Sequence, residues 1–102
     1  MEEIDDRGFD AFLSSASVPV LLLFWKPDCG GCRGLFNALD SFEREQSAQV
    51  QILTMNVEEN FQIPAELEIH SLPALALFRN GEFNRFIGGI VTKMLLTEVL
   101  EE

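Results

Sequence analysis

The chain has 102 residues, 47% of them hydrophobic, which is ordinary globular composition and excludes a disordered tail or a low-complexity linker. Its length predicts a single domain over residues 1–102, and its net charge of −10 excludes nucleic-acid binding because a phosphate backbone would be repelled. The longest apolar run, residues 20–25, is far shorter than the ~20 residues that span a bilayer, so we expect no membrane partner. The acidic start lacks the features of a signal peptide, which favours a cytoplasmic protein, although a chain trimmed of its leader would look the same.

Taken in chain order, the first half predicts two helices and two strands. Phe9, Phe12 and Leu13 share one face at helical spacing, and Asp5 or Asp6 is a suitable N-cap. Residues 20–25 form an unbroken apolar run that predicts a strand covered on both faces. An amphipathic helix is predicted from residue 32 to about residue 46, followed by a strand over residues 49–57.

The second half predicts a weak helix, a hairpin and a final helix. Residues 58–67 are weakly helical, with an interruption at Pro64, and residues 73–78 form another buried strand. Asn80-Gly81 is a strong hairpin signal that leads into an antiparallel strand over residues 82–87, whose ragged alternation does not assign its faces. Thr92 then caps a last amphipathic helix. This order predicts an α/β fold, a central mixed sheet with helices on both faces.

Two cysteines stand together as Cys29-Gly30-Gly31-Cys32. The loop they would close is too small for a disulfide to stabilise the fold much, so redox chemistry or metal binding explains them better. Cys29 is predicted at a helix N-terminus, where the macrodipole favours the thiolate that attacks disulfides, and Cys32 is predicted to be shielded one turn inside. The intervening Gly30 and Gly31 leave the backbone open to a substrate chain. The metal alternative is weaker, because a structural zinc site needs four ligands and the sequence offers only His70 beyond the pair.

The wider pattern resembles the thioredoxin family over nearly the whole chain. The residues that carry the resemblance fall at thioredoxin-like intervals, and the combined set is highly specific: Phe9-Asp10, Leu23-Phe24-Trp25, Cys29-Gly30-Gly31-Cys32, Asn56, Ser71-Leu72-Pro73, Phe78-Arg79-Asn80-Gly81-Glu82 and Gly89. The resemblance implies a thioredoxin-like fold with Cys29 as the nucleophile and Cys32 as the resolving thiol. It also implies a cis peptide at Leu72-Pro73, facing the pair, where backbone groups bind an extended substrate segment.

Several residues depart from the family pattern. Asp28 stands where a tryptophan is usual, Gly31 replaces a proline and Asn37 replaces a helix-kinking proline. Leu23 occupies the position of a buried aspartate, and Thr54 that of its lysine partner. In the family that aspartate takes the proton from the resolving thiol, which leucine cannot do. These changes put efficient, general reductase activity in doubt.

Other residues near the predicted site carry two interpretations. Trp25 is expected both to shape the active-site floor and to fill the core. Arg33 either offsets the charge of Asp28 or is a solvated residue of the first helical turn. His70 either lies beside the cysteines, as the resemblance implies, or is a surface histidine without a role, which is the favoured interpretation. The nine phenylalanines are interpreted as core, with Phe36, Phe42 and Phe78 on predicted buried faces. Gly89, with Gly30, Gly31, Leu72 and Pro73, completes the predicted substrate-binding set.

The sequence therefore predicts a thiol–disulfide oxidoreductase that reduces protein disulfides with the Cys29–Cys32 pair and needs no metal or other cofactor. The predicted partners are protein disulfide substrates and a thioredoxin reductase-like electron donor, and the chain is expected to be a monomer. The alternative is a thioredoxin-fold redox sensor or binding module with weak turnover. Leu23, Thr54 and Asp28 favour that alternative, whereas the intact cysteine pair and Leu72-Pro73 favour the enzyme.

Overall fold

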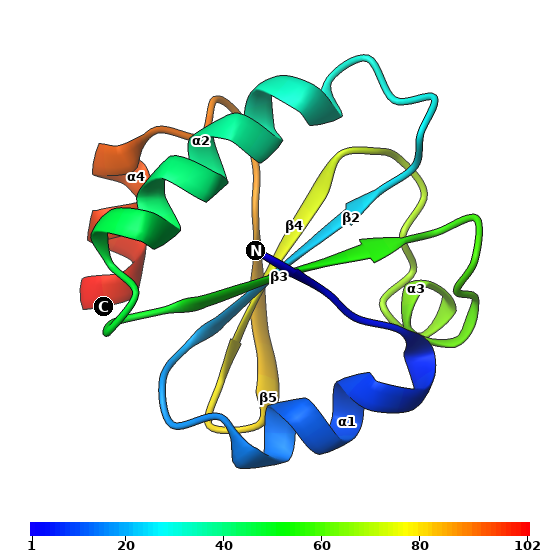
Figure 1. Cartoon of the computed structure of the whole chain (residues 1–102), viewed down its shortest axis with the longest axis horizontal. Coiled ribbons are helices and arrows are strands. Elements are labelled where there is room, and N and C mark those ends of the chain that lie inside the picture. The colour runs from blue at the N-terminus through cyan, green and yellow to red at the C-terminus, as the bar shows by residue number, and fades with distance from the viewer.

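A computed structural model describes residues 1–102, with five strands in one sheet and four helices around it (Figure 1). The elements in chain order are β1 (Glu2–Glu3), α1 (Asp6–Ser15), β2 (Val20–Trp25), α2 (Cys32–Glu45), β3 (Gln51–Asn56), α3 (Gln62–Glu66), β4 (Ala74–Arg79), β5 (Glu82–Ile87) and α4 (Lys93–Glu101). None of these helices has the length and hydropathy of a membrane-spanning segment.

The sheet is mixed, as the sequence predicts. Its strand order is β1-β3-β2-β4-β5, with β1, β3 and β2 parallel to one another and β4 antiparallel to both β2 and β5. The short edge strand β1 was not predicted, because two consecutive glutamates have no strand-like hydrophobic pattern. Its register is set by pairing with β3, where Glu2 lies opposite Leu53 and Glu3 opposite Thr54.

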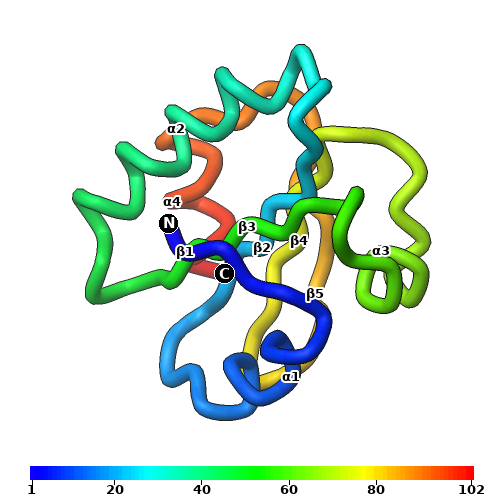
Figure 2. Tube along the Cα trace, turned by 45° about the vertical axis from the view of Figure 1, so that its right-hand side comes forward, coloured from blue at the N-terminus to red at the C-terminus, as the bar shows by residue number.

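Helices cover both faces of the sheet, which confirms the predicted layering. Figure 1 shows α2 and α4 on one side and α1 and α3 on the other, and the trace in Figure 2 follows the same arrangement from a second direction. The strand β2 serves both layers, because its side chains alternate between them. Leu21 and Leu23 belong to the cluster beneath α2 and α4, whereas Val20, Leu22 and Phe24 belong to the cluster beneath α1 and α3.

Three of the four helices have a side-chain oxygen on their first backbone N–H groups. Asp5 caps α1 by accepting from the Gly8 N–H at 2.8 Å, and Thr92 caps α4 by accepting from the Leu95 N–H at 3.1 Å. The Asp6 carboxylate serves α3 from a distant part of the chain, accepting from the N–H groups of Phe61, Gln62 and Ile63. The fourth helix, α2, begins after Gly31 with no side-chain cap.

The β4–β5 hairpin turns at Asn80 and Gly81, both with positive φ, as the sequence predicts. The register of the two strands shifts between Leu77 and Phe78, which explains why the alternation in β5 is ragged. The predicted helix over residues 58–67 is shorter in the structure, covering only Gln62–Glu66.

The interpretation of all nine phenylalanines as core is wrong for four of them. Phe42 and Phe78 are buried as predicted, but Phe36 is 41% exposed, and Phe61, Phe83 and Phe86 are exposed as well. The apolar stripe of α2 is wider than the face that the sheet covers, so Leu39 and Phe42 reach the core while Phe36 remains at its margin.

Candidate functional site

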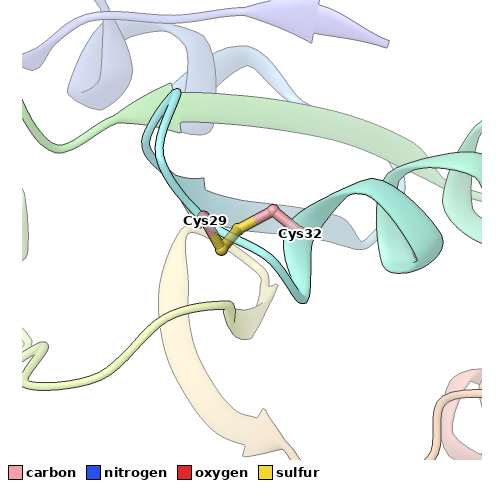
Figure 3. The surroundings of a disulfide bond; sticks show 2 residues. All are labelled: Cys29 and Cys32. Carbon is pink, nitrogen blue, oxygen red and sulfur yellow. A yellow bond between two sulfur atoms is a disulfide. The ribbon is translucent and has the colours of Figure 1, made fainter.

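The two cysteines form a disulfide at the start of α2. The S–S distance is 2.00 Å and the Cα atoms are 5.4 Å apart (Figure 3). Cys29 lies in the turn that follows β2, whereas Cys32 is the first residue of α2. The Cys32 N–H donates to the Cys29 carbonyl at 3.3 Å, so the turn is held closed by backbone as well as by sulfur.

The two sulfur-bearing residues differ in their access to solvent. Cys32 is 6% exposed, while Cys29 is half-buried and lines grooves at the surface. No side chain caps α2, so its first N–H groups have no side-chain acceptor at the end of the helix where Cys29 lies. Unpaired N–H groups and the macrodipole favour negative charge there, which is what a thiolate carries.

The segment before β4 passes beside the disulfide (Figure 3). The Leu72–Pro73 peptide bond is cis, and a Cβ atom built on Gly31 would lie 3.2 Å from Pro73 Cδ. Pro73 therefore packs against the backbone of the Cys-Gly-Gly-Cys turn, and Gly31 leaves room for this close approach.

Two grooves flank the turn, and Lys26, Asp28, Cys29 and Gly30 line both. The first, of about 410 Å³, continues over α3 and the segment before β4, with Val57, Pro64, Ile69, His70, Ser71 and Leu72 in its wall. The second, of about 690 Å³, continues along α2, with Trp25, Pro27, Cys32, Arg33, Phe36 and Asn37 in its wall. A substrate that reaches Cys29 therefore contacts one or both grooves.

The structure brings together most of the residues singled out from the sequence. Asp28 and Gly30 line both grooves, Arg33 lines the second and Leu72 lines the first. Trp25, at the end of β2, also lines the second groove, and its buried Nε1 has no hydrogen-bond partner.

Three predicted site residues, Gly31, Pro73 and Gly89, line neither groove at Cys29. Gly89 is exposed, with a φ of +77°. Its neighbour Gly88 shares a separate groove with Pro73 and Ser71, so Gly89 lies at the edge of the site.

Sequence reasoning missed two residues at the grooves, Lys26 and Phe36. Lys26 follows a buried strand directly, and residues after strand ends are where sites in α/β folds gather; that signal was available. Phe36 was assigned to the core because its helical spacing fits the buried stripe. His70 lines the first groove with Cys29, which agrees with the alternative that places it beside the cysteines rather than with the favoured interpretation of a remote surface histidine.

No group of three or more His, Cys, Asp or Glu side chains gathers closely enough to hold a metal ion. The two cysteines and His70 therefore lack the further ligands that a structural zinc site requires.

Beneath the site, Leu23 lies on the side of the sheet that α2 covers. It is fully buried, and its cross-strand neighbours are Thr54 on β3 and Leu75 on β4. The buried polar residues of the chain are Thr54, Asn56 and Asn60, so no buried carboxylate serves the cysteine pair.

The family model described as thioredoxin matches residues 1–102. The chain belongs to the thioredoxin family. As a thioredoxin-family protein it is a thiol–disulfide oxidoreductase, and Cys29–Cys32 is its redox disulfide. The family acts on protein disulfides.

Among the relatives, the thioredoxin of Haemophilus influenzae is 32% identical over 99 residues, which are 97% of this chain and 92% of that protein. The thioredoxin of Rickettsia felis is 38% identical over 79 residues, covering 78% of this chain and 75% of that protein. The chloroplastic M-type thioredoxin of Spinacia oleracea is 30% identical over 102 residues; the chain is covered in full but spans only 56% of that protein's length.

Proposed function

We propose that this thioredoxin-family protein reduces protein disulfides, with Cys29 as the attacking thiol and Cys32 as the resolving thiol. One observation carries the proposal: the disulfide joins a half-buried cysteine beside an uncapped helix start to a cysteine that is only 6% exposed. Exchange needs an accessible attacker and a second thiol that solvent substrates do not reach first.

The proposed reaction has two steps. The Cys29 thiolate attacks one sulfur of the substrate disulfide, so that a Cys29–substrate bond forms, the substrate S–S bond breaks and the departing thiolate takes a proton from water. Cys32, as its thiolate, then attacks the Cys29 sulfur, which forms the Cys29–Cys32 disulfide and releases the second substrate thiol. Two electrons pass from the dithiol to the substrate, and an external dithiol must return them.

Substrate binding is proposed along the first groove and the adjacent backbone. Pro73 packs against Gly31 and Leu72 lines the groove with Cys29, so an extended segment beside them can present its sulfur to Cys29. Gly30 and Gly31 add no side chains to obstruct that approach, and exposed Gly89 lies at the edge of the same surface.

The cellular setting is also part of the proposal. We propose that residues 1–102 work as one monomeric domain in the cytoplasm, with a thioredoxin reductase-like protein as electron donor. The supporting observations are the single sheet with one core cluster on each face, and a cysteine pair suited to a reducing compartment.

One observation favours a second candidate, a redox sensor or binding module with weak turnover. Leu23 is fully buried and no carboxylate lies among the buried polar residues, so no buried acid can take the proton from Cys32. Resolution would then wait for Cys32 to ionise unaided.

The test is reduction of insulin disulfides by dithiothreitol with catalytic amounts of the protein. We expect acceleration by the wild type and none by Cys29→Ser or Cys32→Ser. A wild type at the background rate, with a Cys29–Cys32 pair that still oxidises and re-reduces in a glutathione titration, would refute the reductase and support the sensor.

A further inference from the structure

Only some of the Lys and Arg side chains of this acidic protein have an ion-pair or hydrogen-bond partner within the protein. Of the seven Lys and Arg residues, three make ion pairs, Arg44 with Asp40, Arg85 with Glu102 and Lys93 with Glu45. The guanidinium of Arg79 donates to the Val99 carbonyl at 2.7 Å. The cations without a hydrogen-bond or ion-pair partner in the protein are those of Arg7, Lys26 and Arg33.

Two of these three partnerless cations lie at Cys29. Lys26 lines both grooves and Arg33 lines the second. Asp28 is the only one of the 17 acidic residues in either wall, and it makes no ion pair with them. Together the two groove walls carry two cations and one carboxylate, an excess of one positive charge on a chain whose net charge is −10.

From this charge pattern we infer that Lys26 and Arg33 recognise acidic side chains that flank the reacting cysteine of the substrate. The inference rests on the proposed function and adds a substrate class to it: an extended segment with carboxylates on either side of its disulfide sulfur. Lys26, common to both grooves, can meet a carboxylate on either side of Cys29, while Arg33 serves the groove along α2. The partly exposed ring of Phe36 supplies an apolar surface beside Arg33 for the rest of the segment.

The net charge of −10 repels an acidic peptide at long range, whereas Lys26 and Arg33 attract it at contact. Added salt distinguishes these two effects, because it screens the long-range repulsion more strongly. At 0.1 M ionic strength the Debye length is about 10 Å, a third of the molecule's 31 Å long axis. Distant carboxylates are then largely screened, whereas a carboxylate in contact with Lys26 or Arg33 is not. Because some long-range repulsion persists, the absolute rate with an acidic peptide does not isolate the two cations, but a comparison of variants does.

The experiment uses the reduced full chain and three peptides with a single cysteine, each activated as a mixed disulfide with 2-thiopyridine. The cysteine is flanked by two Glu, two Ser or two Lys residues. Attack by Cys29 forms the Cys29–peptide bond, breaks the peptide–pyridyl S–S bond and releases pyridine-2-thione, which is followed by stopped-flow absorbance. The measured quantity is the ratio of the second-order rate constants for the Glu and Lys peptides, which cancels any effect of a substitution on the thiolate itself.

We expect Lys26→Gln and Arg33→Gln each to lower that ratio by about two- to fivefold at 0.1 M salt, the range for exposed charge pairs. Arg7→Gln is the matched control: it removes the same charge from a partnerless cation on α1 that lines neither groove, and it should change the ratio less. In 1 M salt the three variants and the wild type should converge.

Equal ratios in all four proteins, or an Arg7→Gln effect as large as the other two, would overturn the inference while leaving the exchange chemistry intact. Failure of all three peptides to react with the reduced wild type would overturn the proposed exchange chemistry itself, and the inference with it.

Discussion

Replacing Leu23 with aspartate should lower the free energy of unfolding and speed the second step of exchange. Leu23 is fully buried beneath α2, among Leu21, Leu39 and Leu75. Removing that apolar side chain from the core costs about 1.5–3 kcal/mol. A buried polar group without a partner adds about 1–3 kcal/mol, and only the Thr54 hydroxyl stands on a neighbouring strand to relieve it. The expected loss is therefore about 2.5–6 kcal/mol while the carboxyl is neutral.

Leu23→Asn is the matched control, since it has the shape of aspartate and does not titrate. Burial raises the pKa of an introduced carboxyl, because desolvation disfavours its charged form. A raised folded-state pKa means that stability is retained below the unfolded pKa and lost as the pH rises towards the folded pKa. Above about pH 3.9, the free energy of unfolding of the Asp variant should therefore fall, relative to that of the Asn variant, by about 1.4 kcal/mol per pH unit until the folded pKa is passed.

Urea unfolding at several pH values measures the stability difference, and stopped-flow release of substrate from the mixed disulfide at pH 6–9 measures the second step. The Asp variant should resolve faster near neutrality because it regains a local proton acceptor, whereas the wild-type rate should rise with pH as Cys32 ionises unaided. Identical rates and pH profiles would show that residue 23 does not serve Cys32. A difference in the free energy of unfolding between the Asp and Asn variants that does not change with pH would show that the carboxyl at position 23 is solvated.

Two other properties are predicted. In the reduced protein, iodoacetamide should alkylate Cys29 before Cys32, because Cys29 is the more exposed and lies beside the uncapped start of α2; peptide mapping that finds Cys32 modified first would contradict this. Burial alone would raise the pKa of Asp6, but N–H bonds from Ile63, Gln62 and Phe61 outweigh it and lower that pKa below its ordinary value. Asp6→Asn should therefore lose about 1–2 kcal/mol at pH 7, an amount typical of helix caps. This stabilisation is present above the unfolded pKa and lost as the pH falls through the lowered folded pKa. Urea unfolding should therefore give the same free energy of unfolding for wild type and variant at acid pH. A difference that persists at acid pH would contradict the role of the carboxylate.

Much of the fold could be predicted because hydrophobic patterns report burial directly. The unbroken run of β2 and the stripe of α2 assign both layers, and Asn80-Gly81 fixes the hairpin. The sequence did not indicate β1, because its two glutamates pair through backbone alone. Nor could it show that Phe36 lies outside the core, since helical spacing defines a stripe but not how much of it the sheet covers.

The candidate site, like the fold, could be predicted only in part from the sequence. The Cys29–Cys32 spacing is local and visible in the sequence, and Pro73 came from the family resemblance. The first groove brings Lys26 and His70 together from segments some forty residues apart, and no local pattern reports that contact. The second groove, with Arg33, is lined by residues 25–37 alone. That α2 alone lacks a side-chain cap can be recognised only by comparison with the other three helices, and the structure is needed to show that Asp5, Asp6 and Thr92 cap those helices.

The division of labour between the two thiols is tested most directly by the reduced Cys32→Ser and Cys29→Ser variants with a peptide disulfide. Mass spectrometry of the acid-quenched reactions identifies the cysteine that carries the peptide and how long the adduct lasts. The account predicts a rapid, persistent adduct on Cys29 in Cys32→Ser, and slow or no adduct on Cys32 in Cys29→Ser, whose remaining thiol is 6% exposed. Faster adduct formation on Cys32 than on Cys29 would contradict it.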